Sequence, residues 1–420
     1  MGVLFRASPF AVRLVGAALT AASAVIAARL YGAVGSGEIF YLVSSISLAS
    51  LVTRLGVDGV LTRTALRSRG EALRVACGSS VAVAVLVAVM AVFLMLGSLA
   101  LATELSNARG GLRIWTFCMA VMSVNLVWIA GAFYRSQGAV EKSIAFETGL
   151  PPVMVIAGVT VDQTFAGGGS YATSIAAAYG LSGAVVLASV LAKSQWRQEL
   201  LSLRFKTLRR RLHELLRFSP AALTNGLVVL APMQTLGWLG AMEAAGIYNA
   251  LLRVSMLIGA FGVVIRSTTV RDTKRAGAHP SRQRDLLAMA KWFAFWSSVA
   301  LAIGWNHRWL ETVFGPEFGA VQRDLLLTML CVQCLYMAGV VIETRVLLLG
   351  RAGILAATSA ATAAAAVAAN GSLTTALGLT GAVLAFAGTV VVNRAVLIGM
   401  FWSCPYETSF TGHERGKSCG

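Results

Sequence analysis

Apolar residues along this chain gather into long runs, and short gaps between the runs hold most of the polar and charged residues. About twelve runs approach the roughly 20 residues that a helix needs to cross a hydrocarbon layer of roughly 30 Å. The pattern predicts an all-α, polytopic membrane protein with about 12 transmembrane helices. The expected spans are Phe10–Leu30, Ile39–Gly59, Val75–Leu101, Leu112–Phe133, Ser143–Val161, Tyr171–Ala192, Pro220–Gly240, Ala244–Ile265, Ala288–Trp305, Leu325–Leu349, Ala352–Ala369 and Ala376–Trp402.

Two of these runs have unusual features. The first follows a basic N-terminus, as the apolar part of a signal peptide does, but it is too long and another span follows at once. We expect it to be retained as the first helix. The fifth contains Pro151 and Pro152, which lack the backbone N–H that a helix interior needs. We expect an interruption there, shielded by neighbouring helices.

Basic residues concentrate in every second gap between the runs. The odd gaps hold only Arg29, Arg109, Arg113, Arg308 and Arg323. The sixth gap is the richest and carries Lys193, Arg197, Arg204, Lys206, Arg209, Arg210, Arg211 and Arg217. Lysine and arginine accumulate in short loops that stay in the cytoplasm. We therefore expect the N-terminus, the even gaps and the C-terminus to be cytoplasmic, an N-in/C-in topology.

Composition supports a membrane protein independently of the runs. Hydrophobic residues make up 57% of the chain and charged residues only 13%, and the mean hydropathy is +0.74. A soluble domain does not reach these values. The net charge of +17 is spread over several gaps rather than gathered on one face. It therefore suits anionic membrane lipids, and we expect no nucleic-acid partner.

The chain also shows signs of an internal duplication. Ser8-Pro9 opens a run that ends near Gly32, and Ser219-Pro220 opens a run that ends near Gly240. A parallel repeat of two six-helix bundles would place a substrate site near the midplane between them, although a chance Ser-Pro match is the alternative. The expected organisation is an N-terminal bundle over 1–192, a basic cytoplasmic linker over 193–217, a C-terminal bundle over 218–403 and a cytoplasmic tail over 404–420.

Four short stretches carry a family resemblance through their order and spacing. They are ARLYGAVGSGEIFY over Ala28–Tyr41, Leu216–Arg253 with GIYNALLR at its end, VFGPEF over Val313–Phe318, and LTGA over Leu379–Ala382. Together they resemble the Wzx-type oligosaccharide flippases of the polysaccharide biosynthesis family. This family belongs to the superfamily of multidrug, oligosaccharidyl-lipid and polysaccharide exporters. One departure concerns the seventh helix, where many relatives have an acidic residue and this chain has Pro232–Thr235.

The resemblance implies a transporter rather than an enzyme. Its expected substrate is a polyprenyl-diphosphate-linked oligosaccharide, moved from the cytoplasmic to the periplasmic leaflet of the bacterial inner membrane by alternating access. This would serve O-antigen, lipopolysaccharide or exopolysaccharide synthesis, and a polysaccharide polymerase and chain-length machinery are the implied partners. We expect no cofactor, because the chain has no phosphate-binding Gly-x-x-x-x-Gly-Lys-Ser/Thr loop for ATP.

Ionisable residues inside the spans are the leading site candidates, because burying a charge at mid-bilayer costs at least about 2.5 kcal/mol. Arg253 lies well inside the eighth run, and a guanidinium can grip a phosphate with two hydrogen bonds. The alternative is an ion pair with a carboxylate such as Glu343. Arg54 can be neutralised by Asp58, four residues on, although Arg54 and Arg63 remain candidates for the cytoplasmic mouth of a cavity.

Other candidates have equally simple structural explanations. Arg13 near the start of the first span can contact a lipid diphosphate or extend to the headgroups. Glu343 and Glu147 can carry an exchanged proton or form interfacial ion pairs. Asn125 and Asn225 can bind sugars or join helices.

Two other function classes remain open. A multidrug or metabolite antiporter would share the fold, although arginines outnumber acids in the spans. A membrane glycosyltransferase or polymerase would generally need larger periplasmic loops. Cys331 and Cys334 lie on an apolar run without a second cysteine pair or a nearby histidine, and the histidines fall in gaps or the tail. We therefore expect no metal site and no catalytic residues.

Overall fold

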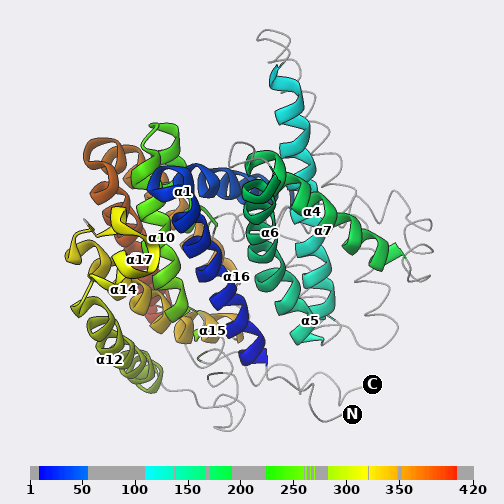
Figure 1. Cartoon of the computed structure of the whole chain (residues 1–420). Helices are drawn as coiled ribbons and strands as arrows, with labels where there is room; N and C mark the ends of the chain where they lie inside the picture. The colour runs from blue at the N-terminus through cyan, green and yellow to red at the C-terminus, as the bar shows by residue number, and fades with distance from the viewer. Residues whose placement is uncertain are drawn as a thin grey trace, which may run out of the picture.

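The computed structural model of the protein describes residues 9–54, 109–136, 139–165, 171–191, 224, 226–259, 261–262, 265, 269, 282–319, 321–348 and 352–403. Within these ranges the chain is almost entirely helical, with no strand (Figure 1). Five helical stretches in them are long and apolar enough to cross a membrane. The expected all-α, polytopic membrane fold is therefore confirmed.

The described helices follow the expected order of spans. They are α1 (Pro9–Arg54), α4 (Arg109–Ser136), α5 (Val140–Ile144), the π-helical turn η1 (Ala145–Gly149), α6 (Leu150–Phe165), α7 (Tyr171–Leu191), the helix Gly226–Trp238, α10 (Met242–Gly259), α12 (Arg282–Trp305), α13 (Trp309–Phe314), the 3-10 turn η2 (Pro316–Phe318), α14 (Arg323–Ala338), α15 (Val340–Leu348), α16 (Ala352–Ala369), the π-helical turn η3 (Asn370–Thr374) and α17 (Thr375–Ser403). The third span, the linker and the C-terminal tail fall outside the described residues.

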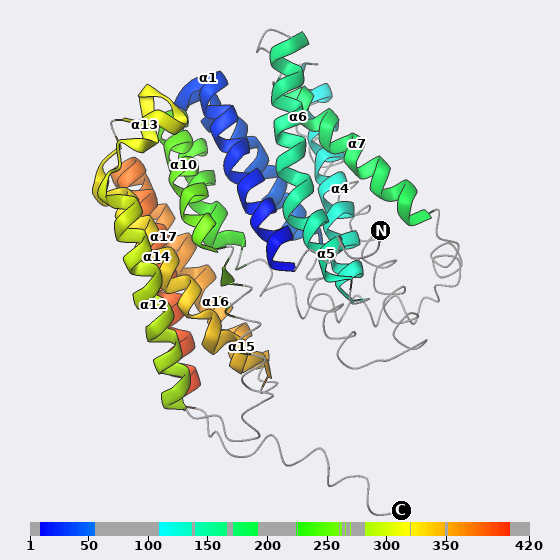
Figure 2. The ribbon, with the colours of Figure 1, turned by 60° about the horizontal axis from the view of Figure 1, so that its bottom comes forward.

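The first two expected spans are the two legs of α1. Helical structure runs through Pro9–Arg54, with a non-helical residue at Gly32, where φ is 68°. A positive φ of this kind suits glycine, which has no Cβ to clash with the backbone. The two blue legs of α1 run in different directions from this point (Figures 1 and 2). The expected eight-residue gap over 31–38 is therefore too long, because Gly32 alone departs from helical structure.

Glycines with positive φ also lie at or beside other odd gaps. They are Gly240 at the end of the seventh span, Gly315 between the ninth and tenth spans and Gly378 near the start of the twelfth span. A glycine allows the backbone to change direction at each of these points. Gly240 follows the helix Gly226–Trp238 as Gly32 follows the first leg of α1.

The fifth span passes its two prolines without a break. Pro151 and Pro152 lie at the start of α6, directly after the π-helical turn η1. A proline ring collides with the carbonyl four residues earlier in a regular α-helix. The wider π turn changes the register just where those carbonyls lie, so helical structure continues from Val140 to Phe165. The expected interruption is a local widening of the helix.

The tenth span has a small irregularity at one residue. α14 ends at Ala338 and α15 begins at Val340, with Gly339 between them in helical conformation. The two helices together form one apolar stretch, Arg323–Val346, that is long enough to cross a membrane, as expected for the run over Leu325–Leu349.

The helices form two groups that meet along α1 and α10. Elements α4, α5, α6 and α7 lie to one side of α1, and α12, α14 and α17 lie on the side of α10 (Figures 1 and 2). We call the described residues up to 191 the N-terminal half and those from 224 onward the C-terminal half. α1 and α10 pack against each other more extensively than any other two described elements.

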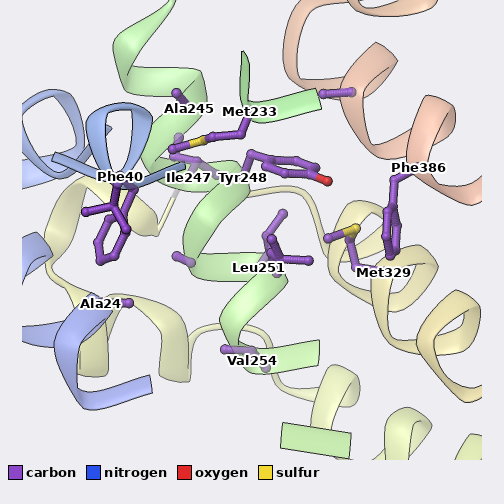
Figure 3. Close-up of a cluster of buried hydrophobic side chains, with 14 of the residues drawn as sticks. Ala24, Phe40, Met233, Ala245, Ile247, Tyr248, Leu251, Val254, Met329 and Phe386 are labelled. Carbon is purple, nitrogen blue, oxygen red and sulfur yellow. The ribbon is translucent and has the colours of Figure 1, made fainter. Parts of the chain in front are cut away.

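Helix α10 lies at the centre of the apolar core. Tyr248 and Leu251 are fully buried in it. Figure 3 shows Phe40 of α1 on one side of α10, with Met329 of α14 and Phe386 of α17 on the other. Buried apolar side chains therefore join the halves through α10.

Glycines bring the two halves into backbone contact near the turn of α1. A Cβ atom added at Gly37 would lie 1.8 Å from the carbonyl oxygen of Met242. A Cβ added at Gly246 would lie 2.0 Å from the carbonyl oxygen of Ala33. Small residues allow such close approach between helices in membranes. No side chain fits between α1 and α10 at these points, so the halves are closed against each other there.

Candidate functional site

A cavity of about 400 Å³ lies between the two halves. Its wall comes from α1, α4, η1, α6 and α7 on one side, and from the helix Gly226–Trp238, α10, α14 and α17 on the other. Along the first leg of α1 it runs from Arg13 to Ser23, away from the Gly32 turn. Substrate sites of two-bundle transporters lie in this position between the repeats.

Arg253 contributes to the wall from α10. Its Nε donates a hydrogen bond of 3.2 Å to Oδ1 of Asn249, one turn earlier, and its guanidinium lies 5.5 Å from the centre of the Phe40 ring. Among the described residues it has no carboxylate ion-pair partner. Its Nη1 also lies 3.8 Å from Sδ of Met256, a weak acceptor. These three side-chain contacts leave other donors of the guanidinium for a ligand in the cavity.

The alternative pairing of Arg253 with Glu343 is wrong. Glu343 lies 3.6 Å from Nη1 of Arg394, a residue of α17, and Glu343 is not part of the cavity wall. The negative charge of Glu343 is thus neutralised by Arg394 and not by Arg253. Arg253 is left as a cation that faces the space between the halves.

Glu147 lies in the opposite wall, on the π-helical turn η1. The carboxylate is buried and accepts a hydrogen bond of 3.1 Å from Oγ of Ser143. It packs against Gly131 of α4, where an added Cβ would lie 2.6 Å from its Cγ. The neighbouring Thr148 packs against Gly16 in the same way. The turn that accommodates the prolines therefore also brings Glu147 and Thr148 into the wall, a frequent role of π turns at functional sites.

The rest of the polar wall is mostly uncharged. Arg13 is the second arginine in it, so two arginines and one glutamate are the charged groups of the described lining. Hydroxyl and amide groups can donate and accept hydrogen bonds, as a polyhydroxyl ligand requires. The uncharged polar residues of the wall are Thr20, Ser23, Ser47, Thr148, Tyr179, Gln333 and Tyr336.

Two other sequence candidates lie next to the cavity rather than in its wall. The Arg54 guanidinium stacks 4.5 Å from the ring centre of Trp128, which does line the cavity. Asn125 accepts a hydrogen bond of 2.8 Å from Ser50 and donates one of 2.7 Å to Thr53. Asn125 therefore joins α4 to the second leg of α1. Arg63, Asn225 and the Arg54 neighbour Asp58 fall outside the described residues.

The sequence analysis missed Arg394. This arginine is 3% exposed and lies inside the last span, Ala376–Trp402, in none of the gaps. An arginine in the middle of an apolar run was the available signal, and it is the same signal that identified Arg253.

The departure from the family pattern in the seventh helix has a structural role. Gln234 donates a hydrogen bond of 2.6 Å to Ser44 and accepts one of 3.1 Å from Ser45. The amide of Gln234 can donate one of these hydrogen bonds and accept the other, whereas an ionised carboxylate at this position could only accept. The uncharged residue therefore links the helix Gly226–Trp238 to α1.

Comparisons with known proteins identify the fold. No known protein family and no curated protein matches the sequence. Three solved structures are similar along nearly their full length. The eukaryotic MATE transporter AtDTX14 has a TM-score of 0.62 at 12% identity, over 96% of this chain and 95% of the other. A Vibrio cholerae MATE transporter, VcmN, has a TM-score of 0.59 at 13% identity, over 93% and 94%.

The third structure is the inward-facing conformation of a multidrug resistance MATE family transporter of the MOP superfamily. It has a TM-score of 0.56 at 15% identity, over 93% of each chain. Likeness at these identities establishes a shared fold. The chain therefore shares its fold with solved MATE transporters, and a shared fold does not distinguish an oligosaccharide transporter from a multidrug transporter.

Proposed function

We propose that the protein moves a polyprenyl-diphosphate-linked oligosaccharide between the leaflets of a bacterial inner membrane by alternating access. Sugars and a diphosphate cannot cross hydrocarbon readily, because each unsatisfied polar group costs several kcal/mol there. A polar cavity between two helical halves removes this cost while the polyprenyl tail stays in lipid. The MATE-like fold supports the transport part of the proposal.

Arg253 is the residue that favours an anionic substrate for the cavity. It lies in the cavity wall on a helix that is otherwise largely buried and apolar, with no carboxylate partner among the described residues. A guanidinium can form two parallel hydrogen bonds with phosphate oxygens. Arg13 lines the same cavity from α1, so the arginines of the described lining outnumber its single acid. This balance favours an anionic ligand over a cation.

The uncharged wall suits the glycan part of such a substrate. Thr20, Ser23 and Ser47 line the cavity from the two legs of α1, and Gln333 lines it from the other half. Sugar-binding sites generally combine such groups with apolar surface. The exposed apolar side chains Leu14 and Val15 follow Arg13 in α1, where the lipid tail can remain in contact with the bilayer.

The second candidate function is export of a drug or metabolite in exchange for an ion. Glu147 is the observation that favours it, because a buried carboxylate in the wall can bind a cation or carry a proton. The same residue can couple glycan export to a proton gradient. Glu343 is less suited to this role, since its carboxylate is held by Arg394. ATP has no part in either scheme.

A gene deletion tests the proposed function. We expect the lipid-linked glycan to accumulate on the cytoplasmic leaflet of the deletion strain and to reach the periplasmic leaflet again when the gene is restored. Glycan that reaches the periplasmic side at the normal rate without this protein, in a strain with no second exporter, would contradict the proposal. A deletion that raises sensitivity to organic cations and leaves the glycan unaffected would favour the second candidate.

The proposed pathway also defines the protein's partners. A polysaccharide polymerase and its chain-length machinery would use the translocated glycan on the periplasmic side. Genes for these proteins, or for glycosyltransferases, adjacent to the gene for this chain would support the proposal.

A further inference from the structure

Arg394 is a buried arginine whose contacts converge on one residue of the cavity wall. Its Nη2 donates a hydrogen bond of 2.8 Å to the carbonyl oxygen of Tyr336, and its guanidinium carbon lies 4.3 Å from the centre of the Tyr336 ring. The Arg394 residue is 3% exposed, and its Nε has no hydrogen-bond partner. Two separate contacts, one to the backbone and one to the ring, therefore fix Tyr336.

Tyr336 lies on the face of α14 that borders the cavity. Gln333, Tyr336 and Met337 all line the cavity, at the three- and four-residue spacing of one helix face. Arg394 covers one side of the Tyr336 ring through a cation–π contact. The ring is thus held against α17 while it borders the cavity. A rigid aromatic surface of this kind is a suitable platform for the apolar face of a sugar ring.

The absence of a side chain at Gly339, directly after α14, makes room for this arrangement. A Cβ added at Gly339 would lie 2.4 Å from Cδ of Arg394 and 2.5 Å from its Nε. Glycine between α14 and α15 is therefore required for the arginine to reach the Tyr336 carbonyl.

Neutralisation of the negative charge of Glu343 does not by itself explain the contacts that Arg394 makes. Only Nη1 of Arg394 approaches the carboxylate, at 3.6 Å from Oε2 of Glu343. The Glu343 side chain is 24% exposed, whereas the Arg394 side chain is 4% exposed. An arginine that served the carboxylate alone is expected to form two parallel hydrogen bonds with it. Here the better hydrogen bond goes to Tyr336, at 2.8 Å.

We infer that Tyr336 is a stacking surface for a sugar ring of the substrate and that Arg394 is the residue that positions it. This inference rests on the proposed function and assigns its glycan contact, separately from the diphosphate contact at Arg253. It predicts that changes at Tyr336 or Arg394 weaken binding of the glycan and leave binding of the lipid diphosphate unchanged.

Two lipids separate these contributions in a binding measurement on the full-length protein in nanodiscs. One is the lipid-linked glycan that accumulates in the deletion strain, and the other is sugar-free polyprenyl diphosphate. We expect Tyr336→Leu to weaken glycan binding about tenfold, in line with the loss of one aromatic contact, and to leave the sugar-free lipid unaffected. Tyr336→Phe keeps the ring and should bind both lipids as the wild type does.

Variants of the positioning residue complete the test. We expect Arg394→Met to show the same selective loss as Tyr336→Leu, and the double change Arg394→Met with Glu343→Gln to retain that loss. Recovery of glycan binding in the double variant would overturn the positioning role, because it would leave compensation of Glu343 as the sole function of Arg394. Thermal unfolding of each variant identifies any that fails to fold, and Tyr336→Leu then tests the stacking surface by itself.

The two levels of the proposal fail in different ways. A wild-type protein that binds neither lipid contradicts the proposed function. A wild-type protein that binds both lipids, together with a Tyr336→Leu variant that weakens both equally or neither, contradicts the sugar-stacking role and leaves the proposed function intact.

Discussion

The carboxylate of Glu317 accepts a hydrogen bond from the backbone amide of Ala33, the residue that follows the turn of α1. The positive φ of Gly32 interrupts the helix, so an amide at the start of the second leg has no partner within α1. Glu317 belongs to the VFGPEF stretch of the C-terminal half. A carboxylate at a helix N-terminus also interacts favourably with the helix dipole.

A second contact joins the same two segments. Arg29 on the first leg of α1 donates to the carbonyl oxygen of Val313 at 2.9 Å, and also to that of Thr312. Both carbonyls lie at the end of α13, where a helix leaves such groups unpaired. The two halves thus complete each other's helix ends at the side of the molecule where α1 and α10 are in backbone contact.

Removal of the Glu317 carboxylate should therefore release the α1 turn. We expect Glu317→Ala to accelerate amide hydrogen exchange about ten- to a hundredfold in the peptide that contains Ala33, because a hydrogen bond to a charged group stabilises by about 1.5–3 kcal/mol. Exchange is read by mass spectrometry. Glu311→Gln changes an exposed carboxylate on the same segment and is the matched control. Equal exchange in all three proteins would show that the contact does not hold the turn.

Arg253 should be required for export. We expect Arg253→Ala to abolish glycan export at an unchanged protein level, and Arg253→Lys to restore it only in part. Lysine keeps the charge but cannot form two parallel hydrogen bonds with a phosphate. Export is measured as the glycan that reaches the periplasmic leaflet, with protein level followed by immunoblot. Wild-type export by Arg253→Ala would assign the residue a structural or silent role.

Glu147 should determine how transport responds to a proton gradient. We expect Glu147→Gln to transport at a rate that no longer changes with an imposed pH gradient, because the amide keeps the shape of the carboxyl group and cannot release a proton. The measurement uses proteoliposomes with and without the gradient. Glu343→Gln is the comparison, and its response should match that of the wild type. A gradient response that persists in Glu147→Gln would exclude this residue as the coupling group.

Backbone contact between α1 and α10 makes Gly246 sensitive to any side chain. An added Cβ there would lie 2.0 Å from the carbonyl oxygen of Ala33, which cannot move without shifting α1. We expect Gly246→Ala to lower the thermal unfolding temperature. Gly388→Ala in α17 is the control, because a Cβ there meets nothing within 4 Å and alanine favours a helix. A variant at Gly246 as stable as the control would contradict the close contact.

The ion pair between Arg345 and Asp285 should stabilise the junction of α15 and α12. Nε of Arg345 lies 3.0 Å from Oδ1 of Asp285, and the two side chains are 9% and 5% exposed. Loss of Asp285 removes this carboxylate from a buried arginine. We expect Asp285→Ala to reduce the free energy of unfolding by about 3–5 kcal/mol. The double change Asp285→Leu with Arg345→Met should recover most of it, as measured by reversible unfolding in detergent or bicelles.

The sequence by itself determined the helical class, the position of most spans and the importance of an arginine inside an apolar run. Hydropathy runs encode these features directly, because a helix must satisfy its own backbone in lipid and an embedded charge is costly. The same arguments located Arg253, Arg13 and Glu147, which the structure brings together around one cavity. The sequence also places Gly32 and Gly240 at the ends of apolar runs, and both residues have positive φ in the structure.

The tertiary structure alone decided which polar groups meet. Glu343 pairs with Arg394 rather than Arg253, Asn125 joins α4 to α1, and the prolines of the fifth span are accommodated by a π turn. The physical reason is that lipid and protein interior are both apolar, so hydropathy does not show which face of a membrane helix points inward. Rotation and register of each helix follow from close packing at small residues such as Gly339 and Gly246. Those contacts exist only once the helices are assembled.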